Sequence, residues 1–284
     1  MKHLSGLAPL AERYRGFIVD LWGVVHDGVE PYPGAVDCLR RMRAAGCRVV
    51  LLSNAPRRVE AVRETLRRIG VPDDGYDGIL TSGEATREVL SSRALPFLSG
   101  GARRMWHLGP ERDAGLFAGI EGCEALPGPE GAEFVLNTGP DDEGGEDDPG
   151  PYLPALREAA ARELPMLCAN PDLEIVRGGQ RIICAGLLAR CYEEFGGRVH
   201  RIGKPFAPIY PPVLRMLGVP DAAVMAIGDA LATDIAGARN AGLASCWVLG
   251  GIHAELVGAD PVLAEREAAA AGLAPDATLP GLRW

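Results

Sequence analysis

The segment Phe17-Ile18-Val19-Asp20-Leu21-Trp22-Gly23-Val24-Val25 is an apolar run that a single carboxylate interrupts. Such a run, without polar alternation, is typical of a strand buried on both faces of a parallel sheet. A second run, Val49-Val50-Leu51-Leu52, ends at Ser53-Asn54, and apolar side chains at helical spacing follow each of the two runs. Two strand–helix units in succession predict an α/β protein with a doubly wound parallel sheet.

Polar residues follow the predicted strands where each strand ends. Asp20 follows the first strand, Ser53 and Asn54 follow the second, and Asp229 follows a later apolar stretch at 223–228. The carboxyl ends of parallel strands meet at one edge of a sheet, where open α/β proteins bind their ligands. An unpaired carboxylate is costly to bury, so Asp20 is expected to serve a function. The alternative reading is that these residues only begin loops or cap helices.

The last third of the chain returns to the pattern of the first third. Predicted helices at 208–217 and 232–241 alternate with predicted strands at 223–228 and 244–249. If both thirds share one sheet, residues 1–81 and 199–284 form the core domain. Residues 82–198 are then an inserted second domain with its own mixture of strands and helices.

The composition excludes several classes of protein. A net charge of −9, from 38 acidic and 29 basic residues, does not fit a general nucleic-acid binder. No apolar stretch is long enough to span a bilayer, and no signal peptide is visible. Seven cysteines without a C-x-x-C pair argue against disulfides and structural zinc. We therefore expect a cytoplasmic protein that binds neither nucleic acid nor membranes, and homo-oligomerisation stays open.

Lys204 is the only lysine in the body of the chain, since Lys2 is the only other one. A coding bias toward arginine explains most of this imbalance. A site that needs a compact ammonium rather than a planar guanidinium must nevertheless use Lys204. The flanking residues Gly203 and Pro205 indicate a tight backbone around it.

These residues suit the binding of a metal ion and a phosphate group. Two carboxylates, Asp20 and Asp229, are ligands that Mg²⁺ prefers. Ser53 and the amide of Asn54 can donate hydrogen bonds to an anion, and Lys204 can neutralise it. Asp234 can orient Lys204 or a metal-bound water. Taken singly, Asp229 and Asp234 fit equally well as helix caps, and Asn54 fits as an N-cap.

The ordered set of motifs resembles the haloacid dehalogenase (HAD) superfamily. In this resemblance Asp20 is the nucleophile of the first motif, Ser53 the hydroxyl of the second, and Lys204 the cation of the third. The acidic fourth motif corresponds to Asp229 and Asp234. The long insert resembles the type-two cap of class IIA, as do Thr81-Ser82-Gly83-Glu84-Ala85-Thr86 and Ala169-Asn170-Pro171-Asp172. That class contains sugar-phosphate, phosphoglycolate and nitrophenyl-phosphate phosphatases.

The resemblance implies a Rossmann-like core and Mg²⁺-dependent hydrolysis of a small phosphomonoester through an aspartyl-phosphate. Asp20, Lys204 and Asp229 are then catalytic. Ser53, Asn54, Lys204 and the cap residue Asp172 bind the phosphorylated substrate. The metal is held by Asp20, Asp229 and the carbonyl of Trp22, with Asp234 completing the acidic set. For Asp172, a turn after Pro171 is an equally good reading.

Trp22 departs from the pattern of the family. Phosphatases of this family normally carry a second aspartate two residues after the nucleophile, and an indole cannot exchange protons at neutral pH. His26 and Asp27 are the candidate substitutes, and the alternative is that His26-Asp27-Gly28 forms a simple turn. Three functions stay open: a phosphatase, a phosphate-ligand binding protein without turnover, and attack of Asp20 on carbon. We favour the phosphatase, because the nucleophile, the cation and the metal-binding acids all remain.

Overall fold

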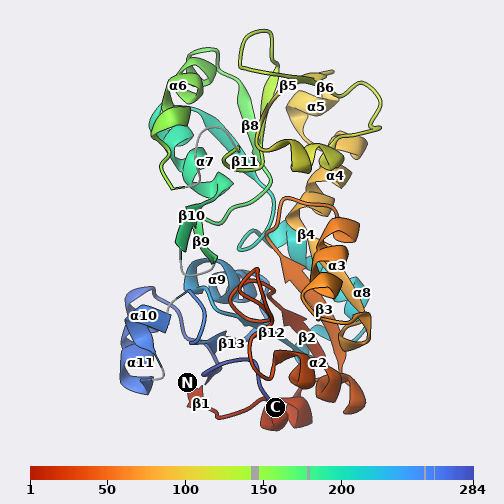
Figure 1. Ribbon diagram of the computed structural model, residues 1–284, viewed down its shortest axis with the longest axis vertical. Helices are drawn as coiled ribbons and strands as arrows, with labels where there is room; N and C mark the ends of the chain where they lie inside the picture. The colour runs from red at the N-terminus through yellow and green to blue at the C-terminus, as the bar shows by residue number, and fades with distance from the viewer. Residues whose placement is uncertain (142–146, 178–179, 253, 259) are drawn as a thin grey trace.

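A computed structural model describes residues 1–141, 147–177, 180–252, 254–258 and 260–284, and most of its strands form two parallel sheets (Figure 1). The larger sheet has seven strands in the order β1-β14-β13-β12-β2-β3-β4. In chain order these strands are β1 (Lys2–His3), β2 (Gly16–Val19), β3 (Arg48–Ser53), β4 (Gly78–Thr81), β12 (Val224–Gly228), β13 (Ala244–Val248) and β14 (Ala277–Leu279). The first and last thirds of the chain therefore share one sheet, and the expected α/β fold class is confirmed.

The alternating side chains of the central strands pack on opposite faces of this sheet. Phe17 and Val19 belong to one buried cluster with residues of the helices α2 (Ala35–Ala44) and α3 (Val59–Arg68). Ile18 belongs to a second cluster with residues of α8 (Tyr210–Leu217). Both faces are covered by helices, which explains why the strands read as continuous apolar runs.

Strand β2 is shorter than the apolar run that predicts it. It ends at Val19, and Leu21, Val24 and Val25 lie in a buried loop instead. The carbonyl of Leu21 accepts hydrogen bonds from the N–H groups of Val25 and His26, at 2.8 and 3.1 Å. This compact turn buries these apolar side chains without pairing them in the sheet. Asp20 therefore lies directly after the strand and not within it.

The middle of the chain forms the second sheet, with strand order β11-β8-β7-β5-β6 (Figure 1). Its strands are β5 (Arg104–Leu108), β6 (Glu124–Leu126), β7 (Phe134–Asn137), β8 (Pro165–Cys168) and β11 (Arg198–Arg201). An antiparallel pair, β9 (Glu174–Arg177) and β10 (Gln180–Ile183), lies between the two sheets in the view of Figure 1.

The remaining helices cover the two sheets and the chain ends. They are α1 (Ala8–Arg13), α4 (Ser82–Ser92), α5 (Pro96–Ser99), α6 (Leu153–Ala161), α7 (Ala185–Glu194), α9 (Ala236–Asn240), α10 (Ala254–Val257) and α11 (Pro261–Ala270). One π-helical turn, Leu231–Ile235, precedes α9, so the helix predicted over 232–241 begins with wider turns. Within the described ranges, no helix is both long and apolar enough to cross a membrane.

Candidate active site

Three adjacent strands of the larger sheet place the predicted site residues at one edge. Asp20 follows β2, Ser53 is the last residue of β3, and Asp229 follows β12. Since β12, β2 and β3 are parallel neighbours, their carboxyl ends lie side by side. The edge predicted from the sequence is therefore the edge at which the structure gathers these residues.

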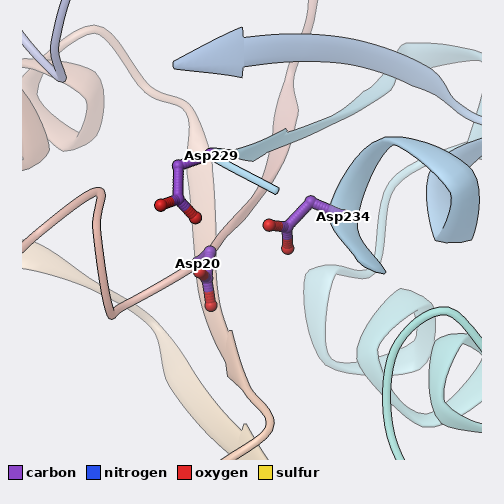
Figure 2. A group of neighbouring side chains, drawn as sticks. All are labelled: Asp20, Asp229 and Asp234. Atoms are coloured by element: carbon purple, nitrogen blue, oxygen red, sulfur yellow. The ribbon is translucent and has the colours of Figure 1, made fainter. Parts of the chain in front are cut away.

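Asp20, Asp229 and Asp234 form a cluster of buried carboxylates at this edge. Figure 2 shows the three side chains pointing toward a common space, from the ends of two strands and from the π-helical turn. One oxygen atom from each lies within 4.8 Å of the others. The exposed fractions are 8% for Asp20 and 4% for Asp229 and Asp234. Three carboxylates so close together in a buried site need positive charge nearby.

Lys204 supplies part of that charge. Its Nζ lies 2.5 Å from Asp20 Oδ1 and 2.7 Å from Asp234 Oδ1, and the residue is 4% exposed. Burial lowers the pKa of Lys204, but the nearby carboxylates raise it by more, so it stays above its ordinary range. The ammonium is therefore charged at neutral pH. It links Asp20, the candidate nucleophile, to Asp234 in the π-helical turn.

One ammonium does not balance the cluster. Burial, followed by the charge of Asp234, raises the pKa of Asp20 well above its ordinary range against the opposing charge of Lys204. Burial and the same neighbour raise the pKa of Asp229 to about 7. The free energy of both carboxylates would fall if a cation entered, and oxygen donors of this kind are suited to a hard divalent ion.

Backbone contacts, rather than helix capping, fix the two later acids. Asp229 Oδ2 accepts a hydrogen bond from the N–H of Ile252 at 2.6 Å, and Asp234 Oδ2 accepts one from Ala230 at 3.1 Å. The π-helical turn has Ala230 as its N-cap, with no side-chain cap. The alternative in which Asp229 and Asp234 only cap a helix is therefore wrong.

Two glycines to which the sequence assigns no role of their own shape the space around Asp229. A Cβ atom at Gly23 would lie 2.0 Å from Asp229 Oδ2, and one at Gly251 would lie 2.1 Å from the same atom. Gly23 also has a φ of +82°, which other residues rarely adopt. Gly23 lies within the Asp20 run and could have been suspected from that place, whereas Gly250-Gly251 carries no such signal.

Asn54 links the core to the middle part of the chain. Its Nδ2 donates to Asp172 Oδ1 at 2.8 Å and to the carbonyl of Lys204 at 3.0 Å, and its Oδ1 accepts from the N–H of Lys204 at 2.8 Å. The N-cap of α3 is Arg58, so Asn54 is not the helix cap that the sequence also allowed. Burial raises the pKa of Asp172 to about 6, against the charge of Lys204.

Ser53 is buried beside these groups. Its Oγ accepts a hydrogen bond from the N–H of Ala55 at 3.1 Å, and it retains its own O–H as a donor. Asp172 receives a further contact at its N–H, which donates to Asn170 Oδ1 at 3.0 Å. The structure thus places the loop that carries Asp172 against the Asn54–Lys204 pair.

Trp22 contacts a segment far away in the sequence. Its Nε1 donates to the carbonyl of Val176, in β9, at 2.7 Å. Its ring meets the ring of His26 edge-on, with centroids 5.4 Å apart. Val176 could not be recognised as a partner from the sequence, because nothing in a strand of ordinary composition marks one backbone carbonyl as the acceptor for an indole N–H.

His26 and Asp27 occupy a turn. Burial lowers the pKa of His26 to about 4, and its Nδ1 accepts from the N–H of Gly28 at 2.9 Å. Asp27 Oδ1 accepts from the N–H groups of Val29 and Glu30, both at 2.8 Å, and these bonds lower the pKa of Asp27. The interpretation of His26-Asp27-Gly28 as a turn agrees with the structure.

The fold and the carboxylate–lysine site define a class of hydrolases. Residues 17–120 match the family of haloacid dehalogenase-like hydrolases, and residues 201–283 match a HAD-hydrolase-like family. A solved haloacid dehalogenase-like hydrolase from Brucella suis 1330 is 34% identical, with a TM-score of 0.84, covering 98% of this chain and 99% of that chain. The chain belongs to the haloacid dehalogenase-like hydrolase family, and the resemblance seen in the sequence is confirmed.

Two further relatives are phosphatases. Glycerol-3-phosphate phosphatase from Gallus gallus is 26% identical over 271 residues, which cover 83% of this chain and 79% of the relative. A solved glycerol phosphate phosphatase from Mycobacterium tuberculosis, in complex with magnesium, is 24% identical with a TM-score of 0.65. The match covers 89% of this chain and 73% of that one, and it shows a shared fold.

Proposed function

We propose that this enzyme is a Mg²⁺-dependent phosphatase that hydrolyses a small phosphomonoester, such as a sugar phosphate, through a phosphoryl group carried on Asp20. One observation carries the proposal. The carboxylate of Asp20 lies within one buried cluster with Asp229 and Asp234, and Lys204 Nζ bridges Asp20 and Asp234. The chicken relative acts on a phosphomonoester, glycerol 3-phosphate, which supports this reaction class.

The donor set fits the proposed metal. Asp20, Asp229 and the carbonyl of Trp22 would hold Mg²⁺, with Asp234 beside them. The raised pKa values of Asp20 and Asp229 support a cation at this place. A magnesium ion bound there would neutralise charge on the phosphoryl oxygens.

Each residue of the site then has its own role in the proposed reaction. A carboxylate oxygen of Asp20 bonds to phosphorus as the bond from phosphorus to the leaving oxygen breaks, and water later hydrolyses the aspartyl-phosphate to the free carboxylate and inorganic phosphate. The hydroxyl of Ser53 and the backbone amide of Asn54 bind phosphoryl oxygens, and Lys204 neutralises them while Asp234 orients it. Because these groups are buried and already held in place, little reorganisation accompanies the transfer.

Residues 82–198 act as the inserted cap in this proposal. Its segment with Asp172 contacts the core through Asn54 and is suited to touch the substrate as well as to exclude water. The second sheet supports a separate cap, although its edge strand β11 extends to Arg201. We place the protein in the cytoplasm, where small phosphorylated metabolites are found.

The test is phosphate release from a panel of sugar and organic phosphates, with and without Mg²⁺. Wild type should release phosphate only with Mg²⁺, and Asp20→Asn should release none. Acid quenching should trap phosphate on the wild-type chain and not on the variant. Mg²⁺-dependent binding without release would identify a binding protein, and halide release without metal would identify chemistry on carbon.

A further inference from the structure

The side chain of Trp22 makes a structural contact with the β9–β10 pair. The indole N–H of Trp22 donates to the carbonyl of Val176 at 2.7 Å, so its one polar group points to the β9–β10 pair. The other side of the ring is closed by Gly28, where a Cβ atom would lie 2.3 Å from Trp22 Cη2. The indole is therefore held between the turn of the core and a strand of the middle part. It cannot donate a proton to a leaving group.

The neighbouring titratable groups are occupied by the turn. His26 Nδ1 accepts from Gly28, and Asp27 Oδ1 accepts from Val29 and Glu30. Asp172 Oδ1 accepts from the amide of Asn54, and the same amide also binds the backbone carbonyl of Lys204. Among the residues that the structure describes, His26, Asp27 and Asp172 are thus engaged with these partners, and the indole of Trp22 itself offers no acid.

With Trp22 in place of an acid, the charge on the leaving oxygen determines how easily the leaving group departs. In the proposed reaction, Asp20 forms a bond to phosphorus while the bond from phosphorus to the leaving oxygen breaks. The electron pair of that bond stays on the leaving oxygen. Without a proton donor the group leaves as an anion, which is unfavourable for an alkoxide and much easier for a phenolate, an enolate or a carboxylate.

We propose that this enzyme acts on phosphoric esters and anhydrides whose leaving group departs without protonation, namely aryl phosphates, enol phosphates and acyl phosphates. The inference rests on the proposed phosphatase function and narrows its substrate class. Within the phosphomonoesters of the proposed function, simple alkyl phosphates, including glycerol phosphate and the primary esters of sugars, are then turned over more slowly than these activated substrates.

The experiment measures kcat/KM for the Mg²⁺-loaded enzyme with substituted phenyl phosphates, acetyl phosphate, ethyl phosphate and glycerol phosphate. In wild type, kcat/KM should rise steeply as the leaving group becomes more acidic. A general acid contributes about 10²–10⁴ in rate, so Trp22→Asp should reduce the ratio between aryl and alkyl substrates by about that factor. Similar kcat/KM values for alkyl and aryl substrates in wild type would overturn the inference.

Two further variants keep the inference testable if Trp22→Asp fails to fold. Trp22→Phe removes the N–H and keeps a ring, and it should retain the steep dependence. Asp172→Asn should also leave the dependence unchanged, whereas a steeper dependence would show that Asp172 donates the proton and would refute the inference. If wild type hydrolyses no substrate above the level of Asp20→Asn, the proposed function itself fails, which is a different result from a shallow dependence.

Discussion

Asn54 and Asp172 join the two sheets of this enzyme, because Asn54 Nδ2 donates to Asp172 Oδ1 at 2.8 Å across 118 positions of sequence. Asn54 follows β3 in the larger sheet, and Asp172 follows β8 in the smaller one. The same amide holds the backbone of Lys204, at 3.0 Å from its carbonyl. One side chain, Asn54, therefore contacts both the middle part of the chain and the backbone of Lys204.

Removal of this link should weaken substrate binding. Asp172→Ala deletes an acceptor that pairs with a buried amide, a loss of about 1.5–3 kcal/mol, which is roughly tenfold or more in KM. Asp172→Asn keeps an oxygen acceptor and is the matched control, with a smaller rise in KM. Steady-state kinetics on an aryl phosphate checks this. Equal KM values for wild type and Asp172→Ala would contradict the role.

Lys204 should be irreplaceable for activity. Lys204→Met leaves Asp20 and Asp234 buried without their counter-charge, and breaking a buried pair costs about 3–5 kcal/mol of folding stability. We also expect kcat to fall by roughly 10²–10³. Urea unfolding and phosphate release measure the two effects.

The chain offers its own control, because Lys2 is the only other lysine and is exposed on β1. Lys2→Met should change neither stability nor kcat. Lys204→Arg should not restore activity, since a planar guanidinium does not fit the space between two carboxylates at 2.5 and 2.7 Å. An active arginine variant would refute the requirement for a compact ammonium.

Gly251 should be required for metal affinity. In Gly251→Ala the new Cβ would lie 2.1 Å from Asp229 Oδ2, so that carboxylate must move. Displacement of a ligand by its surroundings typically costs about 10–100-fold in metal affinity. Gly128→Ala is the control, because a Cβ there meets no atom within 4 Å. Titration calorimetry with Mg²⁺ decides the matter, and an unchanged affinity in Gly251→Ala would argue against Asp229 as a ligand.

His26 should make stability depend on pH. Burial lowers its pKa from 6.5 to about 4 in the folded protein. Between these values the unfolded chain binds the extra proton, so the contribution of His26 is complete above pH 6.5 and is lost as the pH falls toward 4. The loss is on the order of 3 kcal/mol. It should appear as the difference between the urea-unfolding profiles of wild type and His26→Gln, and parallel profiles would contradict it.

The sequence alone predicted the main lines of the fold and the composition of the site. Apolar runs without alternation indicated strands buried on both faces, and the packing of Phe17 and Ile18 on opposite faces confirms this. Since parallel strands end at one edge, the polar residues after each run were expected to meet there. This inference needs only local patterns and the handedness of the crossovers, which is why it succeeds.

Only the tertiary structure decided which atoms meet. The bridge from Lys204 to Asp20 spans 184 positions, and the bond from Trp22 to Val176 spans 154. Side chains placed by elements so far apart in sequence have no local pattern that encodes their distance. Gly251 likewise has no local pattern that marks it, because its role is the absence of a Cβ atom beside a carboxylate that follows another strand. The residue types determined the available chemistry, and packing determined which groups are free to perform it.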